Sequence, residues 1–233
     1  MKLSDLLERL ALGELSNLAL VNQDSPAEIN VSDHLKVISY ANQALTNLFT
    51  KFILSEKEIL VNTYDPETMY YLRPEYARSS DSSQDVKYLD DSGDIKFTGG
   101  VIKILDVYGQ YGQPLYINDI DEHSSLFTPQ FDCLQITSID FGTVFSVIYQ
   151  AQHSKLSVDN LDIVIDIPVY FEEAIQAYIA SKVLGHMNGK ENTGKSQEYM
   201  NRYEMICANA AEKDTARTSI VSSNMKLIQR GFV

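Results

Sequence analysis

The stretch that decides the fold reads DIPVYFEEAIQAYIASKVLGHM (166–187), NGKENTGKS (188–196) and QEYMNRYEMICANAAEKD (197–214). Apolar residues recur at helical spacing in its first and third parts, which predicts two helices. The middle part is rich in glycine and polar residues, which predicts a loop that makes the two helices antiparallel. The first helix has a suitable start, because Asp166 can cap it and Pro168 suits a first turn.

The first of these helices is apolar on most sides, and such a helix is usually buried on most sides. Mostly small side chains form one line along it: Tyr170, Ala174, Ala177, Ser181 and Gly185. Small residues at this spacing let another helix approach closely. Two alternatives fit this line equally well. It is either the interface with another subunit or a contact within the core of a monomer.

The second helix is amphipathic. Its apolar residues recur at helical spacing: Tyr199, Met200, Tyr203, Ile206, Cys207, Ala210 and Ala211. One apolar stripe on an otherwise polar helix predicts packing against the first helix.

The charge of the chain is unevenly distributed. Residues 1–150 hold 22 Asp and Glu against 10 Lys and Arg, whereas residues 151–233 hold 10 against 9, within a net charge of −13. An acidic body argues against ordinary nucleic-acid binding, which needs cations on phosphates. It is compatible with a protein that surrounds DNA without holding it, because negative walls repel phosphate.

The cysteines and the hydropathy of the chain indicate its cellular compartment. Cys133 and Cys207 are too few for a disulfide framework, so we expect buried thiols in a reducing compartment. Acidic residues interrupt any apolar run at the N-terminus, and no stretch approaches the roughly 20 apolar residues of a membrane span. We expect a soluble protein that is made in the cytoplasm and does not bind membranes.

Taken in order, the chain predicts an α+β fold, a small helical bundle with a β-rich insertion and an extended C-terminal tail. Helices are expected from near Ser4 and from His34 to about Phe52. The expected strands are Ile59–Val61, Met69–Leu72, Val101–Leu105, Pro114–Ile117, Leu134–Ile136, Val144–Tyr149 and Leu161–Ile165. The expected parts are residues 1–64 (helices and first strand), 65–158 (β-rich insertion), 159–215 (helical hairpin) and 216–233 (arm).

One segment matches a catalytic motif letter for letter. Residues Gly189–Ser196 read GKENTGKS, the phosphate-loop pattern GxxxxGK[ST]. Such a loop must follow a buried strand and open a helix, so that backbone N–H groups converge on phosphate. Here a helix precedes the segment, and no later strand supplies a magnesium-binding Asp. A turn between two helices is therefore the preferred interpretation, with nucleotide binding as the alternative.

Other candidate chemistry is weaker. The acidic groups Asp90, Asp91, Asp94 and Asp119, Asp121, Glu122 lack the ligand spacing of a calcium loop and are expected to be solvated turns. The histidines His34, His123, His153 and His186 fit no zinc spacing, and no GxSxG pattern occurs. We therefore expect no catalytic residue, no metal, no cofactor and no enzymatic activity.

The paired helices resemble a known family. Ile167-Pro168, Glu173-Ala174-Ile175, Tyr178 to Leu184, a short Gly/Asn loop, Tyr199 and Tyr203-Glu204 are similar to the closing signature of head-to-tail adaptor proteins of tailed bacteriophages. The resemblance implies a helical bundle with a β insertion that assembles as a twelve-fold ring beneath the portal. It covers about 50 residues, and the β insertion of this chain is longer than in compact members.

The resemblance also implies partners and a location. They are copies of the chain itself, the portal protein and downstream tail proteins, in the neck of the virion after assembly in the host cytoplasm. DNA would pass through the ring without specific binding. The C-terminal tail, either a disordered end or a docking arm, would reach the portal through Ile220, Met225, Lys226, Leu227, Ile228, Arg230, Phe232 and Val233.

Two other functions stay open at this point. One is an NTP-binding protein that uses the 189–196 segment. The other is a cytoplasmic interaction module, unrelated to virions, whose β region binds a peptide or a small molecule.

Overall fold

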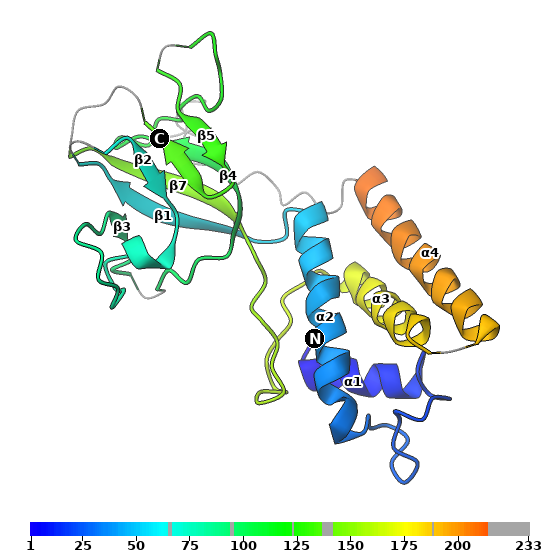
Figure 1. Cartoon of the computed structure of the whole chain (residues 1–233). Coiled ribbons are helices and arrows are strands. Elements are labelled where there is room, and N and C mark those ends of the chain that lie inside the picture. The colour runs from blue at the N-terminus through cyan, green and yellow to red at the C-terminus, as the bar shows by residue number, and fades with distance from the viewer. Residues whose placement is uncertain (65–66, 94–95, 123, 137–141, 188, 214–233) are drawn as a thin grey trace, which may run out of the picture. The chain divides into compact units, whose positions relative to one another are not determined.

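The computed structural model describes residues 1–64, 67–93, 96–122, 124–136, 142–187 and 189–213 (Figure 1). The chain forms two compact units, a helical unit (Met1–Leu54 and His153 onward) and a β unit (Ser55–Gln152). Helices and antiparallel sheets confirm the predicted α+β fold. The boundaries differ from the expected 65 and 158, because the first strand pairs along its whole length with the last strand of the β unit.

Four helices make up the described part of the helical unit: α1 (Leu3–Leu12), α2 (Val31–Lys51), α3 (Glu172–Gly185) and α4 (Lys190–Glu212). Leucines at helical spacing bury one face of α1, and Gly13 follows its last residue. α2 begins at Val31 rather than at His34, because the chain already turns at Asn30, whose carbonyl accepts the Asp33 amide at 2.8 Å. A 3-10 turn (Val169–Phe171) leads into α3.

The segment before α3 holds the N-terminus of the chain. The Leu3 amide donates to the Ile163 carbonyl at 3.0 Å, and Lys2 forms an antiparallel bridge with Val164. The sequence predicts a strand at residues 161–165, but only this bridge forms. The reason is that its partner, the N-terminal chain, turns into α1 at Leu3.

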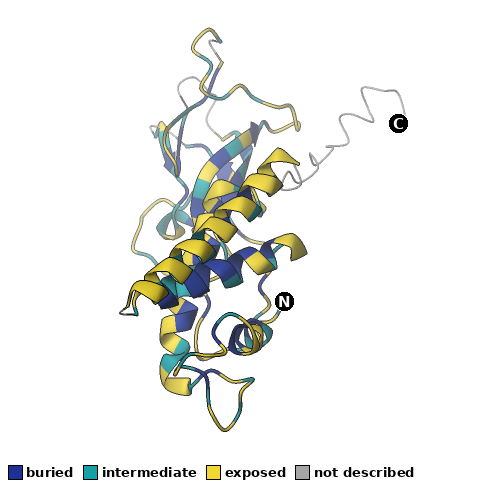
Figure 2. Ribbon diagram, turned by 90° about the vertical axis from the view of Figure 1, so that its right-hand side faces the viewer, coloured by how far each residue is buried: buried dark blue, intermediate teal, exposed yellow. Residues whose placement is uncertain are grey.

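α3 is the central helix of the helical unit and contacts α1, α2 and α4. Figure 2 shows it largely in the colour of buried residues, in contrast to α4. Its buried residues occupy all sides: Ala174, Ile175, Ala177, Tyr178, Ile179, Ala180, Ser181, Val183 and Leu184. The prediction of a helix buried on most sides is confirmed.

α4 has a single narrow contact stripe, as its amphipathic sequence predicts. Only Tyr203, Cys207 and Ala210 are buried. Of the other predicted stripe residues, three are half-buried and Ala211 is exposed. Most of the helix surface therefore faces solvent (Figure 2).

The described part of the β unit has seven strands: β1 (Glu56–Asn62), β2 (Met69–Tyr71), β3 (Leu89–Asp90), β4 (Val101–Tyr108), β5 (Phe127–Gln130), β6 (Cys133–Gln135) and β7 (Val144–Ala151). They form a sheet of order β3-β1-β7-β4 and a second of order β2-β6-β5, with every pair antiparallel. β1 and β7 pair in continuous register, with Ile59 opposite Val147. The register of β4 on β7 shifts twice, so this edge strand is irregular.

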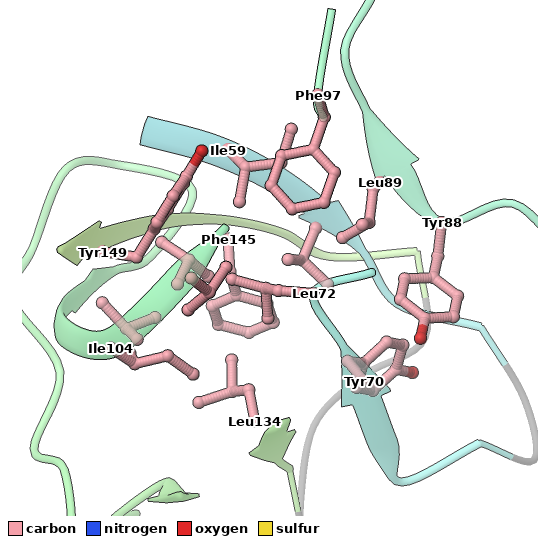
Figure 3. Close-up of a cluster of buried hydrophobic side chains, with 14 of the residues drawn as sticks. Ile59, Tyr70, Leu72, Tyr88, Leu89, Phe97, Ile104, Leu134, Phe145 and Tyr149 are labelled. Carbon is pink, nitrogen blue, oxygen red and sulfur yellow. The ribbon is translucent and has the colours of Figure 1, made fainter. Parts of the chain in front are cut away.

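One hydrophobic core joins the two sheets of the β unit (Figure 3). Ile59 and Phe145 reach it from the larger sheet, and Tyr70 and Leu134 reach it from the smaller one. Tyr88 adds a polar anchor, because its hydroxyl donates to the Tyr71 carbonyl at 3.0 Å and accepts the Tyr71 amide at 2.7 Å. Burial raises the pKa of Tyr88, so the phenol stays protonated in this role.

Most strands of the β unit appear where the sequence predicts them. The segments expected around residues 59–61, 69–72, 101–105, 134–136 and 144–149 correspond to β1, β2, β4, β6 and β7. The segment at 114–117 is extended but makes only isolated bridges. β3 and β5 were not expected, because β3 has two residues and β5 contains Pro129, which lacks an amide donor.

Candidate functional site

The α3–α4 hairpin is the candidate site, because it holds both the predicted subunit line and the phosphate-loop pattern. The two helices meet closely at Ser196 of α4, whose Oγ donates to the Ser181 carbonyl at 2.8 Å. A Cβ atom at Gly185 would lie 2.9 Å from the same Oγ. Any larger residue at Gly185 would therefore force Ser196 to turn away, so the small side chains permit this helix contact.

The partner of the small-residue line is, in large part, the chain itself. Ala174, Ala177 and Ser181 are buried within the helical unit. Another subunit cannot reach them while the unit is folded, which corrects the prediction of a subunit interface at these three residues. Tyr170, with 41% exposure, and Gly185 remain accessible.

Ion pairs connect α3 to α4 and to α1. Arg202 of α4 lies 2.6 Å from Glu173 of α3, and Arg9 of α1 lies 2.6 Å from Glu172 of α3. The sequence does not indicate these pairs, because their partners lie 29 and 163 residues apart and isolated charges carry no pairing signal. Such exposed pairs fix orientation more than they stabilise.

The phosphate-loop pattern does not form a loop. α4 already begins at Lys190, so the segment from Lys190 to Ser196 is helical, and the preceding element is α3 rather than a strand. Lys195 Nζ lies 2.7 Å from Glu191 Oε1 in an i,i+4 pair, and this hydrogen bond lowers the pKa of Glu191. The chain reversal is thus shorter than the expected loop at 188–196. The reason is that the ion pair and the Ser196 contact stabilise the helix despite Gly194.

We expect the full chain to show no saturable binding of ATP with Mg²⁺ up to about 1 mM, the upper end of usual enzyme affinities. The Thr193 amide already donates to the Gly189 carbonyl at 3.1 Å, and the later amides of an α-helix donate in the same i to i−4 pattern, so they are not free to wrap a phosphate as the loop requires. Titration of fluorescent ATP would measure this. Saturable binding that Lys195→Ala abolishes and Lys190→Ala retains would contradict the prediction.

The prediction of solvated turns is wrong for Asp91, which is 5% exposed, and for Asp90, which lies in β3 and is half-buried. Asp90 lies 2.5 Å from Arg78, and Asp119 Oδ1 accepts the Asp121 amide at 3.0 Å. Among the described residues, no three His, Cys, Asp or Glu side chains are grouped as metal ligands. Asp94 and His123, which belong to the residues considered for metal binding, lie outside the described residues.

Neither cysteine has the properties of a nucleophile. Both thiols are free and buried, as predicted. Burial raises the pKa of Cys133 to about 11 and also raises the pKa of Cys207. Both sulfurs therefore stay protonated near neutral pH, and the thiol is a poor nucleophile.

Two hollows of the helical unit lack the groups of a reaction centre. A groove of about 780 Å³ along α2 is lined mainly by amide, hydroxyl and apolar side chains, with Lys155 and Tyr178 as its titratable groups. The second, of about 570 Å³, contains Glu172 and Glu173. Because both carboxylates are paired with arginines, neither is poised as a general base.

The predicted portal-docking arm, residues 220–233, lies outside the described residues. The described helices include none that is both long and apolar enough to cross a membrane. The described surface that could contact a partner therefore belongs to the two units and ends at residue 213.

Comparison with known proteins gives no family assignment. No protein-family model matches the chain, and no curated protein sequence matches it significantly. The function must therefore follow from the residues and the geometry of the chain itself.

Proposed function

We propose that this chain is a structural protein of a tailed-bacteriophage virion, which forms a ring between portal and tail, twelve-fold in the family that it resembles. The α3–α4 hairpin carries the proposal, because the residues that resemble the closing signature of head-to-tail adaptors lie on it. The order of helices, β insertion and helical hairpin is the order that the resemblance implies. In this role the protein extends the DNA channel and performs no reaction.

The distribution of charge supports a protein that lets DNA pass. The β unit holds 16 Asp and Glu against 6 Lys and Arg, a net charge of −10 out of the −13 of the chain. A surface of this sign repels phosphate and does not retain DNA. DNA would therefore pass without specific binding, and no cofactor is involved.

Exposed apolar residues of the helical unit support assembly into a larger structure. They include Leu12, Val31, Leu35, Val164, Val169, Tyr170 and Met205. Leu12 and Val169 line the same hollow beside α3, so they lie near each other. Clustered exposed apolar side chains mark interaction surfaces. The partners we propose are copies of the chain, the portal and the next tail protein, in the virion neck after assembly in the host cytoplasm.

Electron microscopy of the purified chain mixed with the portal of the same virus tests the proposal. We expect an added ring on one end of the portal. A monomeric chain on its own agrees with the proposal, since the portal can template the ring. A mixture in which portal particles gain no density would overturn it and favour an interaction module unrelated to virions.

Truncation of the chain after Ser219 should abolish portal binding and leave the fold intact, because the truncated chain still contains all of α4, which ends at Glu212. The arm supplies apolar side chains and two cations, Lys226 and Arg230, for contact with the portal. Co-sedimentation with portal measures the loss. A variant with residues 220–233 in permuted order keeps the length and charge of the arm and should also fail to bind the portal. If the truncated chain still binds the portal, residues 220–233 are not the docking arm.

A further inference from the structure

The β unit has an extended segment whose outer face is unexpectedly apolar. Residues 114–117 lie between β4 and Leu126, with the Leu115 amide donating to the Val107 carbonyl at 2.9 Å. Leu115 and Ile117 pack against the core, so the alternate residue Tyr116 points outward. An outward position on such a segment is normally polar.

The turns on both sides of this segment add further apolar side chains. Tyr111 is 89% exposed, Tyr116 is 59% exposed and Ile120 is 90% exposed. Single exposed apolar residues are common, but three large ones within residues 111–120 make this stretch a candidate interaction surface. We call Tyr111, Tyr116 and Ile120 the apolar strip.

Two residues between Tyr116 and Ile120 are hydrogen-bonded to the neighbouring residues 125–128. Asn118 adopts a left-handed backbone with φ of 57°, and its side chain accepts the Thr128 amide at 2.9 Å and donates to Thr128 Oγ1 at 2.8 Å. The Asp119 amide donates to Ser125 Oγ at 2.9 Å. A loop fixed in this way loses little conformational entropy when it binds a partner.

The surroundings of the strip are acidic. Asp119, Asp121 and Glu122 flank Ile120, and the sequence contains no Lys or Arg between Lys103 and Lys155. A second copy of the same face is disfavoured, because the β unit has a net charge of −10. DNA phosphates and anionic lipid headgroups are repelled by the same charge.

We propose that the apolar strip docks onto a partner protein whose face combines an apolar recess with Arg or Lys side chains. Tyr116 and Ile120 would fill the recess, and the neighbouring carboxylates would pair with the cations at its rim. Tyrosine is enriched at the centre of such interfaces, and rim charges steer the encounter. This inference concerns the β unit alone and does not depend on the connector function.

Panning of a random-peptide phage library against the immobilised full-length chain tests the proposal. We expect enriched peptides that combine Arg or Lys with large apolar residues. The best peptide, labelled with fluorescein, should bind more weakly at high salt in anisotropy titrations. A library that enriches no cationic apolar peptide overturns the proposal.

Matched variants locate the binding site. Tyr116→Ser with Ile120→Ser should weaken peptide binding by about tenfold or more, as expected for interface centres. Asp121→Asn with Glu122→Gln should weaken it several-fold and flatten the salt dependence. Asp81→Asn with Asp85→Asn removes the same charge from another exposed part of the β unit and should change nothing. If the Tyr116→Ser, Ile120→Ser variant unfolds at the same temperature as the wild type and binds the peptide equally well, the proposal is refuted. If that double variant does not fold, peptide binding by Tyr111→Ser, at the most exposed aromatic of the strip, gives the same test.

Discussion

Replacing Tyr203 by alanine should destabilise the helical unit by about 3–5 kcal/mol, the range for removing a buried aromatic side chain. Tyr203 is 1% exposed and is the largest of the three buried residues of α4. Its ring contacts the Tyr178 ring edge-on with centroids 5.2 Å apart, and Lys51 Nζ lies 4.8 Å above it. Since most of α4 faces solvent, losing this ring removes a large share of the buried contact between α4 and α3, while the Ser196 and Arg202 contacts remain.

The matched variant Tyr203→Phe separates the ring from its hydroxyl. The hydroxyl is buried, and among the described residues its polar neighbour is the Cys207 thiol, a weak hydrogen-bonding group. Removing a buried polar atom whose neighbour is only a weak hydrogen-bonding group costs little, so we expect Tyr203→Phe to be about as stable as the wild type. Urea unfolding followed by circular dichroism at 222 nm, where helices dominate the signal, gives both values. A loss in Tyr203→Phe as large as that in Tyr203→Ala would show that the ring is not the anchor.

The effect of Tyr203→Ala should stay within the helical unit. The β unit has its own core, made of side chains from both of its sheets. Hydrogen exchange by mass spectrometry should therefore show lost protection in α4 and unchanged protection in β1 and β7. Equal loss of protection in β7 would mean that the two units do not fold independently.

The local features of the chain followed well from its sequence, because each has a local cause. Helical periodicity placed α1, α3 and α4, and runs of β-branched and apolar residues placed β1, β4 and β7. The prediction of a loop at 188–196 was wrong, because a contact with another helix contributes to the conformation of this segment. Its glycines and polar residues are typical of a loop, but Ser196 contacts α3 and Lys195 pairs with Glu191, and these contacts favour helix.

The partner of an apolar line cannot be predicted from the line itself. Ala177 and Ser181 allow a helix to approach, and the same pattern suits a helix of another subunit or of the same chain. The structure has α4 beside Ser181, a contact that depends on where the chain reverses after Gly185. Two-sided burial of a helix is thus a prediction of packing and not of oligomerisation.

The outer face of the β unit shows a further limit. Tyr116 lies in a segment that the sequence predicts as a strand, and alternation alone does not state which face is inward. Only the contacts of Leu115 and Ile117 with the core decide that Tyr116 is outside. Exposure of an apolar residue, which carries the docking proposal, is therefore a result of the fold.

Within the β unit, Asp91→Ala should cost about 2–4 kcal/mol, because it leaves three hydrogen-bond donors without their acceptor. Asp91 is 5% exposed. Its carboxylate accepts the Ser79 hydroxyl, the Ser79 amide at 3.0 Å and the Phe97 amide at 3.0 Å. It thereby joins two segments that flank β3, and alanine would leave the buried Phe97 amide and the part-buried Ser79 amide unpaired.

The same contacts make this contribution depend on pH. Burial alone would favour the neutral acid, but the hydrogen bonds from the Ser79 hydroxyl and the Phe97 and Ser79 amides outweigh it and lower the pKa of Asp91. A carboxyl group whose pKa is lower in the folded state stabilises the fold above its unfolded pKa, about 3.9 for Asp. This contribution is lost as the pH falls below that value and through the folded-state pKa.

Urea unfolding of the wild type and Asp91→Ala at pH 7 and at about pH 3 measures the effect through the linkage of stability to protonation. The difference in unfolding free energy should be largest at pH 7 and smaller at the acidic pH, where the wild type has lost part of the ionised contribution. Asp91→Asn, which keeps an acceptor but not the charge, should lie between the two at pH 7. Asp85→Ala, at an exposed position of the same unit, should match the wild type at both pH values. If the gap between wild type and Asp91→Ala is the same at both pH values, the ionised carboxylate is not what holds these segments together.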